Sequence, residues 1–574
     1  MAAIRKVLPI LDWLGAYKRA DLRADASAGL TVAVMLVPQA MAYAMLAGLP
    51  PAIGLYASSL PLIAYALLGS SRHLAVGPVA MISLIVFSAC SRVAEPGSAQ
   101  YIATALLLAF LVGAMQLLAG ILRLGSLVNF ISGAVISGFT SAAAIVICLS
   151  QLKHLLGIKL TTTHSVFHLL LQAGRNLGQT HLASLTIGAL TIGGLILFRK
   201  KFPHFPAAFI FVIAGTLIVY LLGPQRLGVQ TVGEVPRGLP SFSVPKAGLD
   251  SIRHLFPAAM AIFLVGYVES ISVARYVAAR EKYKIDPNQE LRGLGLANLA
   301  GAFFSGYPVT GGFSRTAVNY RAGARTALAS IITAVVIIVT VLFLTPLFYY
   351  LPNAVLAAII MVAVASLIDI KEAVHFFIVK KTDGWVLAIT FASTLTLGIE
   401  QGILIGVASS LVVFIWHSSH PHTAELGYLE KDKVFRNVRR FPEVRTFPDV
   451  LILRADASLY FANAKFLEDR LRDAVAEKAN LKWVIVDMSG VNDIDAVAVD
   501  TLEEIIKTYG EHGITFAFAA VKGPVRDVVA RAGWEGKYGR HIGHASISEA
   551  LREIGIWTEN DVRGPEQQPG ERPP

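Results

Sequence analysis

Charged residues are scarce in this chain of 574 residues. Only 16% are Asp, Glu, Lys or Arg, whereas 55% are hydrophobic. Soluble domains carry about a quarter charged residues, so an ordinary soluble protein is excluded. The scarcity ends near residue 420, where the long apolar runs stop and charged residues become frequent. The sequence therefore predicts a polytopic membrane domain followed by a smaller soluble domain.

Cysteine is also scarce. Cys90 and Cys148 lie in apolar stretches, which excludes a disulfide framework and gives no zinc site. His417, His420 and His422 follow the last apolar run, where a juxtamembrane linker explains them better than a metal site. Walker, Ser-His-Asp and haem motifs are missing from the sequence. We therefore predict that the protein is not an enzyme or an ATP-driven pump, and that it has no cofactor and no metal.

Acidic residues are outnumbered by basic ones, and the net charge is +11. Binding of nucleic acid is one interpretation of such a charge. The basic residues, however, cluster in short loops between apolar runs, as the positive-inside rule predicts. We therefore expect no nucleic-acid partner, and a multi-pass protein of the cell (inner) membrane with both termini in the cytoplasm.

The membrane domain contains about fourteen apolar segments. The third segment in each set of seven, near residues 78 and 314, is short and begins with Pro or Gly. Matched interruptions of this kind indicate an inverted repeat and point to a transporter binding site. The expected segments are 27–47, 51–68, 78–93, 101–121, 127–150, 182–198, 205–222, 254–276, 288–304, 314–322, 325–346, 352–368, 384–398 and 401–418.

The expected domains follow from these patterns. The soluble region alternates between short β-branched runs and amphipathic runs, which predicts a small α/β domain. Its strands are expected at 450–453, 484–486 and 514–519, and its helices at 466–478 and 496–509. The complete division is an N-terminal segment 1–26, a transport domain 27–420, a linker 421–445, a soluble domain 446–558 and a disordered tail 559–574.

The stretch from 306 to 319 is the most informative one. Pro308 and the pair Gly311–Gly312 break any helix, and a new helix is expected to start at Ser314 with Arg315 in its first turn. A helix that starts at membrane depth points unpaired N–H groups and its positive dipole end into the protein. Together with a guanidinium group, these amides form a socket for an anion.

A second helix start is expected at Gly77–Pro78, because Pro suits the first turn of a helix. Its amides would face those of the helix that starts at Ser314, and two opposed dipole ends hold an anion without a full charge. The alternative interpretation is an ordinary helix start at the membrane surface. The matching position in the other repeat favours the binding site.

Gln39 and Tyr43 lie four residues apart in the first apolar segment, so they share one helix face next to Pro38. A Gln that faces lipid is costly, so this face is expected to turn inward. The alternative is a Gln that packs between helices beside a Tyr at a kink.

Glu269 stands in the middle of an apolar segment, where a carboxylate indicates a functional site. Paired with Arg315, it could exchange a proton against an arriving anion. The alternative is a structural ion pair that joins two helices, which is compatible with the first interpretation. Glu400, near the end of another segment, is interpreted as structural.

Four stretches carry a resemblance to a known family: VPQAMAYAMLAGLPPAIGLYAS, SRHLAVGPVAMIS, NQELRGLGLANLAGAFF and YPVTGGFSRTAVNYRAGA. They resemble, in order, signatures of the sulfate permease family of anion transporters. The resemblance covers nearly the whole chain. It implies a seven-plus-seven inverted repeat divided into a core and a gate, and a homodimer.

The resemblance also implies a set of site residues. Glu269 resembles the acid of proton-coupled plant and bacterial members, which implies symport with H⁺. One departure is Gly312, where many sulfate-type members have Ser, so this chain lacks a hydroxyl group at that position. The positions that match the substrate site of the family are Gln39, Tyr43, Val79, Ala80, Gly312, Phe313, Ser314 and Arg315.

The soluble part resembles a STAS domain, the anti-sigma-factor-antagonist fold, through the stretch VDMSGVNDIDAVA. In bacterial antagonists a phosphorylatable Ser follows the Asp by two positions. Here that position is Val497, which cannot accept phosphate. We therefore expect a role in dimerisation or regulation, with a possible cytoplasmic protein partner.

These patterns predict a secondary active transporter that takes up sulfate or a related oxyanion with H⁺ by alternating access. Rival interpretations within transport are a bicarbonate or dicarboxylate transporter, with or without coupling to Na⁺, an anion exchanger, and a passive anion channel. A rival of another class is a membrane-anchored signalling protein with the STAS domain as its output. The expected partners are a small inorganic or organic anion and the lipid bilayer.

Overall fold

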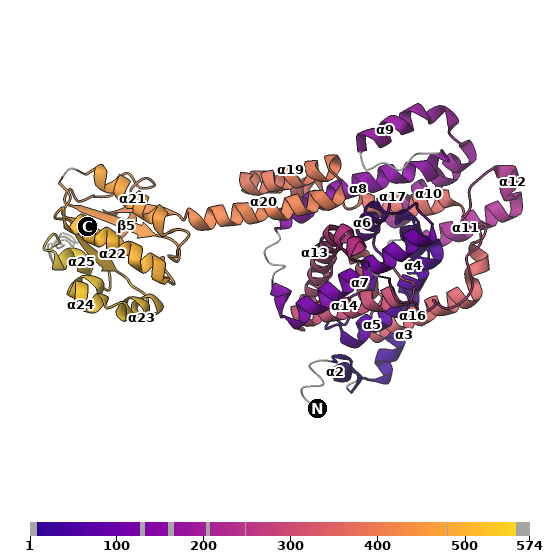
Figure 1. Ribbon diagram of the computed structural model, residues 1–574, viewed down its shortest axis with the longest axis horizontal. Helices are drawn as coiled ribbons and strands as arrows, with labels where there is room; N and C mark the ends of the chain where they lie inside the picture. Colours follow the sequence, from indigo (N-terminus) through magenta and orange to yellow (C-terminus); the bar gives the residue numbers. More distant parts are fainter. Residues whose placement is uncertain are drawn as a thin grey trace, which may run out of the picture. The chain divides into compact units, whose positions relative to one another are not determined.

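The chain divides into two compact units, Met1–Leu411 and Val412–Pro574, in a computed structural model. The structure describes residues 8–15, 17–126, 132–158, 166–201, 207–246, 248–478 and 480–557 (Figure 1). The tail expected at 559–574 lies outside the described residues.

In its described residues, the first unit is helical apart from two short strands and the connecting loops. Its elements, in chain order, are α2 (Ile10–Leu14), α3 (Arg19–Leu46), α4 (Pro51–Ala57), α5 (Leu60–Leu68), β1 (Val76–Gly77), α6 (Ala80–Cys90), α7 (Ala99–Ile121), α8 (Gly133–Leu156), α9 (Val166–Arg175), η2 (Leu177–Gln179), α10 (Leu182–Lys201), α11 (Ala207–Leu222), α12 (Pro224–Leu227), α13 (Leu249–Arg280), α14 (Pro287–Phe303), β2 (Thr310–Gly311), α15 (Phe313–Arg321), α16 (Leu328–Val339), η3 (Thr340–Leu344), η4 (Thr345–Phe348), α17 (Asn353–Ala365), α18 (Ile370–Val379), α19 (Lys381–Thr396) and α20 (Ile399–Ser419).

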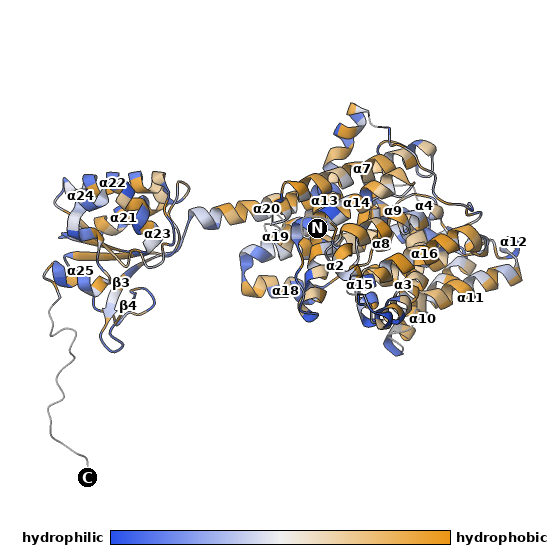
Figure 2. Cartoon of the chain, turned by 90° about the horizontal axis from the view of Figure 1, so that it is seen from below, coloured by the Kyte–Doolittle hydropathy of each residue, from blue (hydrophilic) through white to orange (hydrophobic). Residues whose placement is uncertain are grey.

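Eight helical stretches in the described part are long and apolar enough to cross a membrane, and three apolar helices are shorter. Hydrophobic residues cover much of the outer helix surfaces, as Figure 2 shows for α10, α16 and α20. Many large side chains there are exposed, such as Leu190, Leu217 and Phe414. A surface of this kind is suited to contact with lipid. The prediction of a polytopic helical membrane domain is therefore confirmed.

Two expected segments differ in detail from the structure, and one helix was not expected. The segment 51–68 is two helices, α4 and α5, because the chain turns at Ser58 and Ser59 before α5 begins at Leu60, with Pro61 in its first turn. The segment 325–346 ends in a π-helical turn and a 3₁₀ turn that contains Pro346, which cannot continue an α-helix. The amphipathic α18 was not anticipated between the last expected segments.

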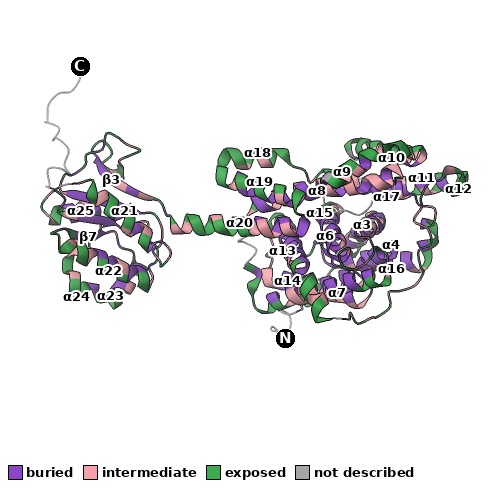
Figure 3. Cartoon of the chain, turned by 45° about the horizontal axis from the view of Figure 1, so that its top comes forward, coloured by how far each residue is buried: buried purple, intermediate pink, exposed green. Residues whose placement is uncertain are grey.

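The helices pack in two groups (Figure 3). The first group contains α3, α5, α6, α7, α13, α14, α15 and α16, and the second contains α8, α10, α17, α19 and α20. Glycine brings helices of each group close together. A Cβ on Gly113 of α7 would meet the backbone of α14 at 2.8 Å, and a Cβ on Gly138 of α8 would meet Leu387 O of α19 at 2.5 Å. On α20, Gly402 and Gly406 pack in the same way against α19.

The first group has two distinct ends. At the Tyr101 end, the Tyr101 hydroxyl donates to Ala47 O at 2.6 Å, and a Cβ on Gly48 would lie 3.1 Å from the Phe87 ring. The C-termini of α3 and α6 and the N-terminus of α7 therefore meet there. At the opposite end, the Asp25 end, the carboxylate of Asp25 accepts from Arg325 N at 2.7 Å. The start of α3 and the start of α16 meet there.

A buried carboxylate joins the start of α14 to the end of α5. Glu290 is fully buried and accepts hydrogen bonds from the Tyr65 hydroxyl and from the amides of Ser70 and Ser71, at 2.7 to 2.9 Å. We expect Glu290→Ala to lower the free energy of unfolding by about 3 kcal/mol, because two buried donors and one half-buried donor lose their acceptor. Thermal unfolding of the purified protein in detergent measures this loss. The exposed Glu95→Ala is the matched control and should leave the midpoint unchanged.

The second unit is a five-stranded sheet with helices on both faces. The strand order is β4-β3-β5-β6-β7, in which β5, β6 and β7 are parallel and β3 is antiparallel to both of its neighbours. The elements are β3 (Thr423–Leu429), β4 (Val434–Asn437), β5 (Val450–Ala455), α21 (Ala464–Ala476), β6 (Trp483–Asp487), α22 (Ala496–Gly510), β7 (Thr515–Ala519), α23 (Gly523–Arg531), α24 (Trp534–Tyr538), η5 (Gly539–Ile542) and α25 (Ile547–Glu553).

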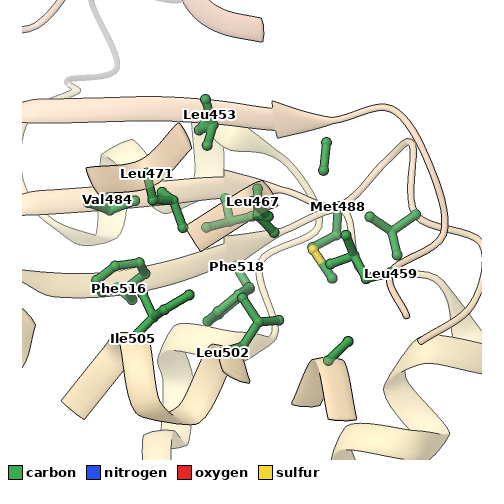
Figure 4. Close-up of a cluster of buried hydrophobic side chains, with 14 of the residues drawn as sticks. Leu453, Leu459, Leu467, Leu471, Val484, Met488, Leu502, Ile505, Phe516 and Phe518 are labelled. Carbon is green, nitrogen blue, oxygen red and sulfur yellow. The ribbon is translucent and has the colours of Figure 1, made fainter. Parts of the chain in front are cut away.

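The α/β prediction for this unit is confirmed, and its core lies between the sheet and α21 and α22. Figure 4 shows Leu467, Leu471, Leu502 and Ile505 from the helices against Val484 and other residues of the strands. The linker expected at 421–445 is wrong, because β3 and β4 form a hairpin there that extends the sheet from β5. The hairpin was missed because β4 is short and only half-buried, so its sequence lacks an apolar run.

Candidate functional site

Two broken helices meet inside the first unit. Strands β1 and β2 pair antiparallel, with Val76 opposite Gly311 and Gly77 opposite Thr310. Helix α6 starts directly after β1 and helix α15 directly after β2, so the strand pair places the two helix starts next to each other. The two segments whose matched positions indicated an inverted repeat therefore lie side by side, and α3 and α13 pack against them.

The starts of both helices are uncapped. Val79 and Gly312 occupy the N-cap positions of α6 and α15, and neither side chain makes a capping hydrogen bond. The first amides of α6, beginning at Ala80, and of α15, beginning at Phe313 and Ser314, therefore have no partner within their own helix. Uncapped amides at two converging helix starts are suited to hold an anion.

Arg315 brings a positive charge to the same place. Its side chain is 2% exposed, and Nη1 donates to Pro78 O at 2.5 Å, which ties α15 to the start of α6. Nε and Nη2 are buried and have no hydrogen-bond partner. A buried guanidinium group with two unused donors is costly unless an anion completes its shell. The guanidinium is not hydrogen-bonded to Glu269 in this conformation.

Gly312 makes room for this guanidinium group. A Cβ built on Gly312 would lie 3.0 Å from Nη2 of Arg315 and 3.2 Å from Cγ1 of Val79. Both approaches are closer than ordinary contacts, so a side chain at this position would push one of the two neighbours away. Many sulfate-type members have Ser at this position. In this chain a Ser side chain would crowd Arg315 or Val79, whereas Gly312 leaves room for both.

We expect Gly312→Ala to lower anion uptake about tenfold, because a displacement of the guanidinium by a few tenths of an ångström weakens its alignment. Uptake into vesicles that contain the purified protein measures the effect. Gly133→Ala is the matched control, since a Cβ there would meet its nearest neighbour at an ordinary 3.6 Å. Unchanged uptake by Gly312→Ala would show that the guanidinium tolerates the added methyl group.

Gln39 and Tyr43 lie on α3, which packs against α6 and α15. Both side chains are 8% exposed, as expected for a face that turns inward. Tyr43 lies close enough to Arg315 and Glu269 to interact electrostatically with both. The structure therefore brings Tyr43 to the place where α6 and α15 begin side by side, which we call the helix crossing.

Glu269 lies on α13, which also packs against α6 and α15. Its residue is half-buried, and Oε2 is buried without a hydrogen-bond partner. The carboxylate is within reach of the backbone amide of Phe313 and of the charge on Arg315. Phe313 is 55% exposed and Ser314 is also exposed, so the site is open on their side in this conformation.

A second layer of polar residues holds the crossing, and sequence reasoning missed it. The Ser270 hydroxyl accepts from Gly311 N at 2.9 Å, and the Thr310 hydroxyl donates to Gly266 O at 2.6 Å, which fixes β2 on α13. Asn298 accepts from Val309 N at 2.8 Å. The available signal was polar residues inside apolar segments, which are costly in lipid unless they are paired.

A second set of bonds ties the halves of the crossing together. The hydroxyls of Tyr307 and Ser83 lie 2.8 Å apart and link the stretch before β2 to α6. The Thr316 hydroxyl accepts from Ala75 N at 3.0 Å and links α15 to the stretch before β1. Because both halves are pinned by buried hydrogen bonds, the two helix starts are held in fixed positions.

Family comparisons match the two units of the chain to separate families. Residues 22–390 match the sulfate permease family, and residues 441–545 match the STAS domain. The chain is 39% identical to the chloroplastic sulfate transporter 4.1 of Arabidopsis thaliana over 568 residues, which cover 96% of this chain and 82% of that protein. It is 35% identical to sulfate transporter 1.2 of the same plant over 544 residues, covering 90% and 83%.

Solved structures share the fold. The murine Solute Carrier 26 family member A9 anion transporter, in the inward-facing state, matches with a TM-score of 0.88 and 27% identity, over 96% of this chain and 94% of that one. The transmembrane domain of the cyanobacterial bicarbonate transporter BicA matches with a TM-score of 0.60 and 24% identity, over 69% and 98%. The second likeness is one of fold alone.

Proposed function

The chain belongs to the sulfate permease family, and from this premise we propose that it is a secondary active transporter of sulfate or a related oxyanion. The observation that carries the proposal is the buried Arg315, whose two unused donors lie beside two uncapped helix starts. A tetrahedral oxyanion offers enough acceptors for a guanidinium group and several amides at once.

Substrate binding would draw on three sources of positive potential. The amides at Ala80 and at Phe313 and Ser314 donate from the two helix starts, and Arg315 supplies the full charge. Gln39 and Tyr43 add neutral donors from α3, which orient the anion without changing the charge of the site. A dianion then meets a site of about one positive charge plus two helix dipoles.

Glu269 would couple the anion to a proton. A charged carboxylate beside the site repels an arriving anion, and protonation removes this repulsion. The proton and the anion therefore favour each other's binding by the same factor, because linkage between two ligands is reciprocal. Return of the empty site completes a cycle of symport with H⁺.

Access would alternate by movement of the first helix group, which carries the site, against the second group. We further propose that the Asp25 end faces the cytoplasm of a cell, as the basic loops indicate. The protein is proposed to work as a homodimer, with the STAS domain in a dimerisation or regulatory role and available to a cytoplasmic partner. If any one of these proposals failed, the proposed substrate would be unaffected.

Uptake of a panel of radiolabelled anions into proteoliposomes, at two external pH values, tests the proposal. We expect sulfate to accumulate faster at the lower external pH, with or without Na⁺. Uptake of bicarbonate or a dicarboxylate in its place, or a requirement for Na⁺, would overturn the substrate or the coupling ion. Currents far above carrier turnover would indicate a channel, and no uptake of any anion would favour a signalling protein.

A further inference from the structure

The Tyr101 end holds an ion pair that the binding site does not use. Nη1 of Arg92 lies 3.2 Å from Oε2 of Glu400. Arg92 follows the end of α6, and Glu400 is in the first turn of α20. Since α6 belongs to the first helix group and α20 to the second, this pair joins the two groups.

The two members of the pair have different surroundings. The side chain of Glu400 is 5% exposed, and its Oε1 is buried with no hydrogen-bond partner, whereas the side chain of Arg92 is 43% exposed. Ser88 and Cys90, at the end of α6, lie close to the same carboxylate. The carboxylate of α20 is therefore enclosed by the end of α6 and depends on the cation that α6 brings.

Gln401 adds a second contact to the same cation. Its amide fits its neighbours when the nitrogen donates to Leu397 O at 3.2 Å and the oxygen accepts from Nη2 of Arg92 at 3.3 Å. Both guanidinium nitrogens of Arg92 then bind consecutive residues at the start of α20. Two contacts from one planar guanidinium group to the same helix end fix the geometry of the pair.

The pair lies away from the site along α6. The helix begins at the site with Ala80 and ends at Cys90, so at 1.5 Å per residue its two ends are about 16 Å apart. The site itself is open beside Phe313 and Ser314, on α15. Closure at the Tyr101 end thus coexists with an open site in this conformation.

We propose that Arg92 and Glu400, with Gln401, form a latch that holds the Tyr101 ends of the two helix groups together while the site is open. When α6 moves away from α20, Glu400 loses its cation and must be hydrated. The latch therefore favours the present conformation and sets how often the transporter leaves it. Breaking it shifts the population toward conformations with the groups apart at this end.

A chemical cross-link tests whether the latch must open. In a background with Cys90→Ser and Cys148→Ser, the variant Arg92→Cys/Glu400→Cys is treated with a short bifunctional thiol reagent that a reductant can release. We expect cross-linking to lower uptake at least about tenfold, and reduction to restore it. This arm rests on the proposed function, because it needs a transported anion.

A matched pair within the first helix group is the control. Arg325 Nη1 and Asp21 Oδ1 lie 2.8 Å apart at the Asp25 end, between the start of α16 and the start of α3. Asp21→Cys/Arg325→Cys should cross-link and keep its uptake, because the two helices move together. Full uptake by the cross-linked Arg92→Cys/Glu400→Cys protein, or failure of this pair to cross-link, would overturn the latch.

A second arm measures conformation without transport. Ser272 is exposed on α13, one turn beyond Glu269, so Ser272→Cys in the same background reports the open site through its labelling rate. We expect Arg92→Gln and Glu400→Gln each to slow labelling about threefold, and the double variant no further, because both remove one interaction. Additive effects, or unchanged labelling in the exposed Arg92→Gln, would overturn the latch even if no uptake were found.

Discussion

Arg315→Gln is expected to lower oxyanion uptake about 100-fold at low substrate concentration, while the protein stays folded. Hydrogen bonds to a charged group contribute about 1.5–3 kcal/mol, and about 2.7 kcal/mol corresponds to a 100-fold change. The substitution removes the charge and the two unused donors, Nε and Nη2, that are placed to meet the anion. Initial uptake rates in proteoliposomes, with substrate far below saturation, measure the loss.

Two further variants separate charge from geometry. Arg315→Lys keeps the charge but cannot donate to Pro78 O and to an anion from one planar group, so its uptake should lie between those of the native protein and Arg315→Gln. Arg321→Gln, in the last turn of the same helix and exposed, is the matched control and should transport normally. Native uptake by Arg315→Gln would remove the guanidinium from the binding site.

The helix crossing was predictable because its signals are local. Proline suits the first turn of a helix and paired glycines favour a break, so Pro78 and the pair Gly311–Gly312 marked the starts of α6 and α15. Their spacing in the two sets of apolar segments indicated that they meet. The strand pair β1–β2 realises this prediction, and the buried position of Arg315 agrees with it.

The partners of these residues were not predictable, because they depend on contacts between distant parts of the chain. Sequence alone left Glu269 or the substrate as partners for Arg315, and the structure pairs its Nη1 with the carbonyl oxygen of Pro78. Glu400 was interpreted as structural, yet only the fold brings Arg92 to it, 308 residues away in sequence. No residue pattern encodes such distances.

In the second unit, too, some elements were predictable from the sequence and others were not. Apolar β-branched runs identified β5, β6 and β7, whose residues are buried on both faces of the sheet. The edge strand β4 carries Arg and Asn and alternates between exposed and half-buried residues. Its neighbour β3 mixes Thr and Glu with apolar residues, so it also lacks an uninterrupted apolar run. Edge strands are half-solvated and short, so their sequence is close to that of a loop.

Glu269→Gln is expected to abolish the pH dependence of uptake while leaving anion binding in place. Glutamine has the shape of a protonated glutamic acid but cannot release a proton, so it fixes the site in the form that tolerates an anion. Without a titrating group, the proton gradient no longer drives the anion, and reciprocal linkage between the two ligands disappears.

The expected result is loss of concentrative uptake under an inward proton gradient, with counterflow exchange of anions retained. The buried Oε2 of Glu269 is the atom concerned, since it has no hydrogen-bond partner that a proton would displace. Glu281→Gln, at the end of the same helix and bound to the Tyr320 hydroxyl at 2.8 Å, removes a carboxylate outside the site and should keep proton-driven accumulation. If Glu269→Gln still accumulated sulfate in proportion to the gradient, another group would have to carry the proton, and the electrostatic argument that links this carboxylate to the Arg315 site would fail.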